Sequence, residues 1–528
     1  MNLQLSRLRL VRINYLVFNE APHITGLTVL RRFFFGGYMS IYDTLNEQQR
    51  QGVFTTDGPV LLLAGAGSGK TRVLTHRVAY LIEEKDVNPY NILAITFTNK
   101  AAAEMRERVD RLVGIDAGGA WIMTFHAACI RILRRYIERI GYASGFTIYD
   151  TDDQKTIMRQ VLKKLDLDPK FYKDRSVLSQ ISSAKDELIS PDEFELAAGS
   201  DYHKRKIAEA YREYQKQLKS NNALDFDDII CKTVELFGSC PEVLDYYSGR
   251  FQYIMVDEYQ DTNTAQFKLI SLLASRFRNL CVVGDDDQSI YKFRGANVKN
   301  ILNFESVFPE AVVIKLEQNY RSTQNILDAA NAVIKNNSER KDKSLWTDEG
   351  TGDKIAYNIY NTAYEEAYGI VSDIKKHAAE SGAYNDYAVL YRTNAQSRSL
   401  EEKFIELGVP YRIYGAVNFY ARKEIKDVLA YLKTIDNARD EVAVRRIINV
   451  PKRGIGLTTL EKASVFAEEN DISLYAAVAR GSEIPSLSKA AAGKLDNFCM
   501  LISELRAKSR ELSIKELISE IINDVKYE

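Results

Sequence analysis

Short apolar runs alternate with segments of helical periodicity along most of the chain. Runs of this length, bounded by glycine and polar residues, are typical of buried strands, and their alternation with helices indicates a parallel sheet. The predicted strands are Val60–Leu63, Ile92–Phe97, Trp121–Phe125, Tyr253–Val256, Leu280–Val283, Val312–Leu316 and Ala388–Tyr391. The pattern therefore predicts an α/β protein with parallel sheets.

The alternation stops between about 148 and 248, where charged helical segments such as TDDQKTIMRQVLKKL predominate. This change predicts a helical domain inserted into the first α/β block. The strand at Val312 would start a second block, and from about 418 the pattern is helical again. The predicted domains are a leader at 1–38, a first block at 39–147 and 249–311, a helical insertion at 148–248, part of a second block at 312–417 and part of a second helical insertion at 418–528.

Residues 1–38 differ from the rest because arginines lie among apolar residues and Glu20 is the only acid. Pro22 and Glu20 interrupt the apolar run, so the segment is a poor secretory signal. The coherent pattern begins at Met39. We expect an over-long reading-frame start or a disordered leader, and a basic DNA-binding arm is the alternative.

A glycine-rich loop, AGAGSGKT, follows the first predicted strand and precedes a helical segment. Strand, glycine loop and helix form the setting of a phosphate-binding P-loop, with the helix N-terminus favouring anions. Lys70 would reach the β- and γ-phosphates, and Thr71 would bind Mg²⁺. Ala64 stands where the general pattern has glycine. The predicted nucleotide-binding set here is Ala64, Gly65, Ala66, Gly67, Ser68, Gly69, Lys70, Thr71 and Arg72.

Two later strands end in acidic residues. Asp257 and Glu258 follow one strand, and Gly284-Asp285 follows the next, with a glutamine, aromatic residues and an arginine directly after it. An acidic pair at a strand end can hold Mg²⁺ and polarise a water molecule, although a single solvated acid there is ordinary. Aromatic residues nearby can stack on bases. The combination predicts a nucleotidase coupled to nucleic acid.

Composition agrees with a nucleic-acid-binding nucleotidase and restricts where DNA, metal ions and a membrane could contact the chain. The 528 residues carry a net charge of −1, with 45% hydrophobic and 27% charged residues, so a DNA track has to be a local patch. Five cysteines are scattered without a C-x-x-C pair, which argues against zinc and disulfides and fits a reducing cytoplasm. The sequence contains no uncharged apolar run of about 18 residues, so no membrane span is expected.

The ordered motifs LNEQQ, AGAGSGKT, ITFTNKAAAEM, TFH, LDFDD, VDEYQD, GDDDQSIYKFRGA, LEQNYRST, YRTNAQSR and VPKRGIG together resemble a known family. From Thr44 onward the chain is similar to superfamily 1 DNA helicases of the PcrA/UvrD/Rep type, with the PcrA branch nearest. The resemblance implies two RecA-like parallel-sheet domains with helical insertions. It also implies ATP and Mg²⁺ as cofactors and 3′→5′ movement along DNA.

The resemblance assigns roles at the nucleotide site. Gln49 would read adenine and Tyr320 would stack on it, although a solvated helix residue and a core tyrosine are the alternatives. The implied catalytic residues are Asp257 as a metal ligand with Thr71, Glu258 as the base that activates water, Gln288 as the γ-phosphate sensor and Arg321 as an arginine finger. An arginine finger stabilises negative charge in the transition state.

The resemblance also implies a DNA track formed by Phe97, Asn99, His126, Tyr291, Phe293, Arg294, Arg392, Asn394, Gly454 and Gly456. Phe293 stands where the family usually has tryptophan. His126 alone would be a structural histidine, and Gly454 and Gly456 alone would be an ordinary turn. The implied partners are single-stranded DNA and 3′-tailed duplex DNA, with repair or transcription proteins as further candidates. A monomer is expected.

The family continues through TLHAAKGLEF-like and VGITRAEE-like motifs that this sequence does not contain. The second α/β block is therefore expected to be incomplete, and the chain to hydrolyse ATP slowly without unwinding DNA. The alternative is an inactive truncated fragment that binds ATP or DNA. A helicase–nuclease subunit is disfavoured because no nuclease-like carboxylate cluster is visible.

Overall fold

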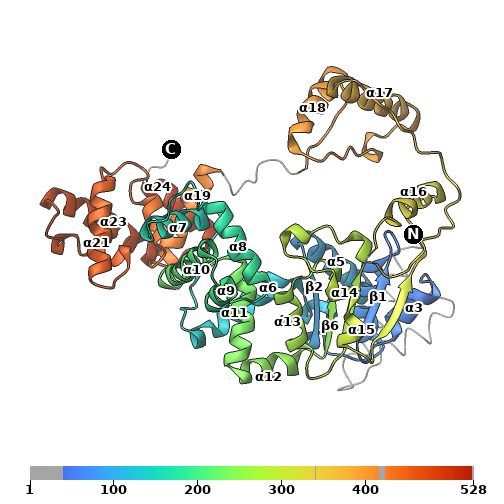
Figure 1. Cartoon of the computed structure of the whole chain (residues 1–528), viewed down its shortest axis with the longest axis horizontal. Coiled ribbons are helices and arrows are strands. Elements are labelled where there is room, and N and C mark those ends of the chain that lie inside the picture. Colours follow the sequence, from blue (N-terminus) through green and yellow to red (C-terminus); the bar gives the residue numbers. More distant parts are fainter. Residues whose placement is uncertain (1–39, 339, 415–421, 526–528) are drawn as a thin grey trace, which may run out of the picture.

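The computed structural model describes residues 40–338, 340–414 and 422–525, so the predicted leader at 1–38 lies outside it. Its centre is a six-stranded sheet, in the order β3-β2-β6-β7-β1-β8, with all neighbours parallel (Figure 1). The strands are β1 (Val60–Ala64), β2 (Ile92–Thr96), β3 (Trp121–Thr124), β6 (Tyr253–Val256), β7 (Leu280–Gly284) and β8 (Val312–Leu316). The predicted α/β class and parallel sheet are confirmed.

Helices bury both faces of this sheet. Along β1, Leu61 and Leu63 enter one hydrophobic cluster, and Val60 and Leu62 enter the other. The first cluster includes residues of α6 (Phe125–Tyr136), α11 (Phe226–Ser239), α12 (Pro241–Arg250), α13 (Thr264–Leu273), α14 (Lys299–Leu302) and α15 (Phe304–Val307). The second includes residues of α3 (Glu47–Phe54), α4 (Lys70–Glu83) and α5 (Asn99–Val113). Burial on both faces explains the continuous apolar strand sequences.

The strand at Val312 is confirmed, but its expected place at the start of a second block is wrong. β8 pairs with β1 from Val60↔Val312 to Ala64↔Leu316, so it is an edge strand of the first sheet. The pattern of a single strand does not say which sheet it joins, because that depends on which edge is free to pair. The first block therefore extends beyond 311.

The predicted helical insertion is narrower than 148–248. Its hydrophobic cluster is built from α7 (Thr151–Lys164), α8 (Asp174–Asp186) and α10 (Tyr202–Ser220), together with Tyr149, Ala223 and Val442, and α9 (Pro191–Ala198) packs against α10. The short strands β4 (Thr147–Ile148) and β5 (Ala223–Leu224) pair beside it. Helices α11 and α12 instead pack on the sheet through residues such as Ile230 and Tyr247. Their apolar faces fit the sheet, and helical periodicity alone does not distinguish these two packings.

The second block contributes helices but no strand among the described residues. After α16 (Gln324–Ile334), α17 (Ala363–Ser381) and α18 (Ser397–Glu406) pack together, apart from the sheet (Figure 1). The predicted strand Ala388–Tyr391 is wrong: Leu390 is 94% exposed, and the apolar side chains of residues 355–359 are also exposed. A strand requires a hydrogen-bonded neighbour, and this segment has none in the described ranges.

The C-terminal helices form a separate core and contact the helical insertion. This core contains α19 (Lys423–Asp436), α20 (Glu441–Ile447), α21 (Leu457–Glu469), α22 (Leu474–Ala479), α23 (Lys489–Lys508) and α24 (Ile514–Val525). Tyr149 donates a 2.8 Å hydrogen bond to Asp440, and Asn437 donates one of 2.9 Å to Thr147. Figure 1 shows α19 beside α7.

None of the described helices combines the length and apolar content needed to cross a membrane.

One contact between the helical insertion and the first block predicts a pH dependence of stability. Asp186, at the end of α8, accepts a hydrogen bond from Asn263, and burial together with the charge of Asp227 raises the pKa of Asp186 to about 7. The folded state therefore holds an extra proton between about pH 4 and pH 7, and the free energy of unfolding falls as pH rises through that window.

We expect Asp186→Asn to raise the melting temperature at pH 8, because it removes a poorly solvated charge and keeps an oxygen for Asn263. The increase should be about 2–4 °C for each kcal/mol gained, and smaller at pH 5. Asp110→Asn, at an exposed position, is the control and should behave alike at both pH values. Equal effects of Asp186→Asn at pH 5 and pH 8 would contradict the prediction.

Candidate functional site

The parallel sheet gathers the predicted nucleotide-site residues at the carboxyl ends of its strands. β1 leads into the glycine loop, β6 into Asp257 and Glu258, β7 into Asp285 and β8 into the loop that holds Arg321. Segments more than 180 residues apart are thereby in contact, since Thr71 donates a 3.3 Å hydrogen bond to Asp257.

The glycine loop joins the buried end of β1, Ala64, to the first turn of α4. The Ser68 hydroxyl donates a 2.8 Å hydrogen bond to the carbonyl of Gly65 and closes the loop. Gly67 and Gly69 adopt φ values of +68° and +87°, a region that favours glycine. A Cβ at Gly67 would also lie 2.5 Å from the Asn319 side chain. The loop therefore offers backbone N–H groups and a helix N-terminus to an anion.

One ion pair and one hydrogen-bonded pair lie directly beyond the loop. The Lys70 ammonium is 3.4 Å from a carboxylate oxygen of Glu258, and Thr71 is bonded to Asp257. Asp257 is 4% exposed, and burial followed by repulsion from Glu258 raises its pKa to about 6. Glu258 has a left-handed backbone (φ +50°), and its N–H bonds to the Asp257 carboxylate at 2.9 Å. A carboxylate and a hydroxyl are oxygen ligands of the type that Mg²⁺ prefers.

A hydrogen-bonded chain connects Glu258 to Gln288. The buried Gln260 donates a 3.0 Å hydrogen bond to Glu258, and its amide oxygen accepts one of 3.0 Å from the Asp285 backbone. The Asp285 carboxylate in turn accepts a hydrogen bond from the Gln288 amide nitrogen. The predicted base and the predicted phosphate sensor thus belong to one network.

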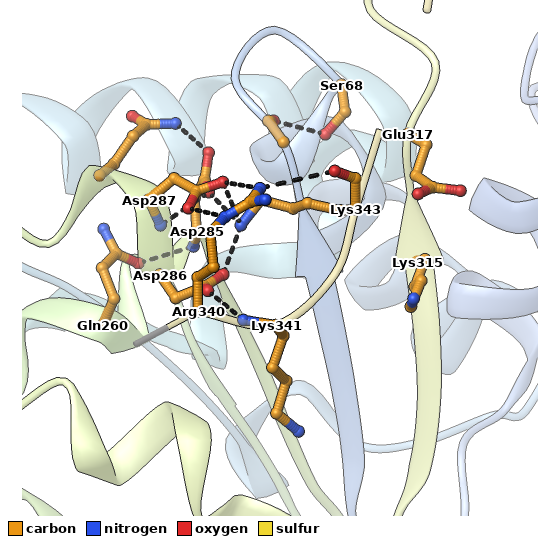
Figure 2. Close-up of polar contacts among 12 residues, drawn as sticks. Ser68, Gln260, Asp285, Asp286, Asp287, Lys315, Glu317, Arg340, Lys341 and Lys343 are labelled. Atoms are coloured by element: carbon orange, nitrogen blue, oxygen red, sulfur yellow. Dashed lines mark hydrogen bonds and ion pairs between the residues drawn. The ribbon is translucent and has the colours of Figure 1, made fainter. Parts of the chain in front are cut away.

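A basic segment at 340–343 covers the acidic loop after β7 (Figure 2). The Lys343 ammonium is 2.8 Å from Asp285 and 2.9 Å from Asp287, and it also contacts Asp286. Arg340 makes two 2.8 Å hydrogen bonds to Asp287. The three carboxylates lie close enough together to hold a metal ion, and Lys343 and Arg340 already pair with them.

The loop after β8 is hydrogen-bonded to the glycine loop. Asn319 donates to the carbonyl of Ala66 at 2.5 Å, and its side-chain oxygen accepts from the Arg321 N–H at 2.8 Å. Tyr320, 42% exposed, donates its N–H to the Gly67 carbonyl at 3.0 Å. The structure therefore brings Tyr320 and Arg321 to the glycine loop, with Arg321 exposed.

Gln49 lies on α3 and is 1% exposed. Its amide nitrogen donates to the Ser68 carbonyl at 2.9 Å, and its oxygen accepts the Asn46 N–H at 3.2 Å. Asn46 also donates to the Tyr320 hydroxyl at 2.9 Å, so the two predicted adenine-binding residues lie on one side of the loop. Arg72 is bonded to Thr44. These bonds use one N–H of the Gln49 amide and leave the second available to a ligand, and adenine reading stays a prediction.

Six predicted DNA-track residues lie on loops or helix starts of the first block. Tyr291 and Phe293 are 41% and 78% exposed, with ring centroids 6.0 Å apart. The Arg294 guanidinium lies 5.5 Å from each ring. An exposed aromatic pair with an adjacent cation can stack on bases.

The other three first-block candidates follow β2 and β3. Phe97 packs edge-on against Phe125 at 5.5 Å, and Asn99 is exposed at the start of α5. His126 is half-buried beside Phe226, and burial lowers its pKa, which favours the neutral imidazole. A neutral histidine can still donate a hydrogen bond, so a coupling role stays a prediction.

The four remaining candidates for the DNA track lie outside the first block. Arg392 and Asn394 directly precede α18, in the part that lies apart from the sheet (Figure 1). Gly454 has φ +71°, its carbonyl accepts a 3.1 Å hydrogen bond from Lys494, and Gly456 caps α21 in the C-terminal helical core. The structure does not bring these residues to the Tyr291–Arg294 surface.

Sequence reasoning missed four residues of the site: Gln260, Asp285 as a hydrogen-bond junction, Asn319 and Lys343. The first three lie inside motifs that pointed to the site, so their buried polar side chains could have been suspected. Lys343 lies in no motif that we identified, and only the folded chain shows its contacts.

Comparisons with known proteins agree with this geometry. The family model for the UvrD/REP helicase N-terminal domain matches residues 45–309, and that for the UvrD-like helicase C-terminal domain matches residues 314–527. The chain is 52% identical over 488 residues to ATP-dependent DNA helicase PcrA of Staphylococcus epidermidis and to that of Staphylococcus aureus. Each match covers 92% of this chain and 67% of the relative. The resemblance inferred from the motifs is confirmed, and the chain belongs to the UvrD-like helicase family.

Proposed function

We propose that this chain is an ATP-dependent DNA helicase motor that couples ATP hydrolysis to 3′→5′ movement along single-stranded DNA. One observation carries the proposal. Lys70, Thr71, Asp257 and Glu258 are within bonding distance of one another at the edge of the sheet where Tyr291, Phe293 and Arg294 present an exposed stacking surface. Nucleotide chemistry and strand binding therefore share one rigid block.

Lys70 and Glu258 would separate when the nucleotide binds. The 3.4 Å ion pair holds the Lys70 ammonium beside Glu258, and phosphate oxygens bound at the glycine loop would compete for it. Glu258 would then be free to accept a proton from the attacking water, as a general base does. Gln288 would donate a hydrogen bond to the third phosphate, and Arg321 would approach the same charge from the adjoining loop.

The residues present fit Mg²⁺. Asp257 is a buried carboxylate whose pKa is raised to about 6, so a cation beside it would relieve an unfavourable charge, and the Thr71 hydroxyl lies 3.3 Å away. The metal would supply charge neutralisation at the phosphates.

The described cysteines are free thiols, which supports a reducing compartment such as the cytoplasm.

A second candidate function is nucleotide and DNA binding without unwinding. The observation that favours it is the absence of a second sheet in the described residues, together with the separation of Arg392 and Asn394 from the first block. A motor of this type needs two blocks that close on the nucleotide. If the second block does not assemble, hydrolysis would not drive strand separation.

The first test is steady-state ATP hydrolysis by the whole chain, with and without poly-dT. We expect DNA to stimulate turnover, and Lys70→Ala and Glu258→Gln to lower kcat by about 10²–10⁴-fold, because one removes phosphate charge stabilisation and the other the base. Glu258→Gln should still bind ATP. Stimulated turnover that survives both substitutions would place the chemistry elsewhere.

Substitution of Phe293 tests the track. We expect Phe293→Ala to weaken poly-dT binding by about 5- to 150-fold, the equivalent of about 1–3 kcal/mol for one stacked base, and Phe293→Trp to preserve binding. Phe171→Ala, at a 75% exposed aromatic on the helical insertion, is the matched control and should leave binding unchanged. Fluorescence anisotropy measures both. Equal loss in the two alanine variants would disprove a specific stacking surface.

Strand separation distinguishes the two candidate functions. The proposed motor should unwind a 3′-tailed duplex in the presence of ATP and leave a 5′-tailed duplex intact. DNA-stimulated hydrolysis without unwinding of either substrate would support the second candidate. Glu258→Gln, which should bind ATP without hydrolysing it, is the control for passive strand melting.

A further inference from the structure

The 340–343 segment makes the densest set of ionic contacts around the nucleotide site. Lys343 contacts all three carboxylates of the loop after β7, and its side chain is 2% exposed. Arg340 binds Asp287, and the backbone N–H of Lys341 bonds to Asp286 at 2.7 Å. Figure 2 shows the Lys341 side chain pointing away from this cluster.

Such a buried cluster is a poor source of stability, because removing charges from water costs about as much as their attraction returns. The position of each atom suggests another purpose. Lys343 lies 2.8 Å from Oδ1 of Asp285, and Gln288 donates to Oδ2 of the same carboxylate. The two side chains therefore share one acceptor group, and Lys343, together with the Asp287 N–H that donates to Oδ1 at 3.2 Å, holds that group in its orientation.

The Asp285 carboxylate in turn orients the Gln288 amide. A carboxylate only accepts hydrogen bonds, so the amide nitrogen of Gln288 must face Asp285. One N–H is used there, and the second N–H remains for a phosphate oxygen. The Asp285 backbone N–H also bonds to Gln260, whose amide nitrogen donates to Glu258. Asp285 is thus the junction between the predicted base and the predicted sensor.

The same segment continues onto the glycine loop. Leu345 packs against Gly65 so closely that a Cβ there would lie 2.0 Å from a Leu345 methyl carbon. The Trp346 carbonyl accepts the Asn319 N–H at 2.8 Å, and the Thr347 hydroxyl donates to the Asn319 carbonyl at 2.8 Å. Lys343 therefore anchors the segment 343–347, which also holds the loop of Tyr320 and Arg321.

We propose that Lys343 is a positioning residue for ATP hydrolysis, which fixes the Asp285 carboxylate and thereby the Gln288 amide that faces the third phosphate. This inference rests on the proposed function for the role of Gln288. Lys343 acts through Asp285, so its loss should affect recognition of ATP and turnover but not the binding of ADP.

The test uses the whole 528-residue chain with the paired change Lys343→Met and Asp286→Asn. This pair keeps the net charge of the cluster, so it avoids the uncompensated buried acid that Lys343→Met alone would leave. Lys341→Met is the matched control, since the Lys341 side chain contacts Glu305 and not Asp285, and Asp286→Asn alone reports the loss of the acid that Lys343 also contacts. Melting temperature reports folding.

We expect the paired variant to lower kcat by about 10- to 100-fold, the effect of a misplaced catalytic group. Affinity for ADP should change by less than about twofold, while the preference for a non-hydrolysable ATP analogue over ADP should fall by about tenfold, because a hydrogen bond to a charged phosphate is lost. Lys341→Met should keep wild-type values, and Asp286→Asn alone should lower kcat less than the paired variant does. Lys343→Arg keeps the charge and should restore part of kcat.

A double-mutant cycle with Gln288→Ala completes the test. If Lys343 acts through Gln288, the paired change should have no further effect in the Gln288→Ala background. Additive effects, equal loss of ADP and ATP-analogue binding, or a folded paired variant with wild-type kcat and preference would each overturn the proposal. If the paired variant does not fold, Lys343→Arg is measured in the same cycle and is judged by the same outcomes.

Failure of the proposed function is distinguishable from failure of this inference. A wild-type chain that hydrolyses no ATP would disprove the motor, and the analogue-to-ADP preference of the variants would still decide the role of Lys343. A wild-type chain that binds the analogue and ADP equally would show that Gln288 contacts no third phosphate and would overturn the inference.

Discussion

The parallel direction of all six strands is the constraint on which the rest of the site depends. Because each strand enters the sheet from the same end, every loop that follows a strand emerges at one edge. Thr71 and Asp257, and likewise Ala66 and Asn319, meet there although long stretches of sequence separate them. A strand running in the opposite direction would carry its acidic end to the far side of the sheet.

Burial then sets the electrostatics of this edge. Asp257, Asp285 and Lys343 are all buried, so each charge depends on the group beside it. Where a partner is present, as for Lys343 among the three aspartates, the charge is held in place. Where none is close enough, as for Asp257, burial and Glu258 raise the pKa. Under the proposed function, a cation and phosphates would complete the charges of this site.

The parts outside the first block are held by a different kind of contact. Polar and ionic groups join the helical insertion to the C-terminal helices, including the Tyr149–Asp440 hydrogen bond and the Lys433–Asp153 ion pair. The segments between them, at 351–362 and 387–391, form no sheet and leave apolar side chains exposed. The nucleotide site is thus assembled on the first block, around a parallel sheet. The described residues of the second block, which a motor would close on that site, form no sheet.

Local periodicity and motif spacing encode strands and phosphate-binding loops, so the parallel α/β class, the first-sheet strands, the glycine loop and the Asp257–Glu258 pair could be predicted from the sequence. It did not determine that Val312–Leu316 joins the first sheet, that α11 and α12 leave the helical insertion, or that Ala388–Tyr391 lacks a partner. Those outcomes depend on which free edges and apolar faces are available in the folded chain. Only the tertiary structure brought Lys343 to Asp285, since buried charges find partners through space and no local pattern marks them.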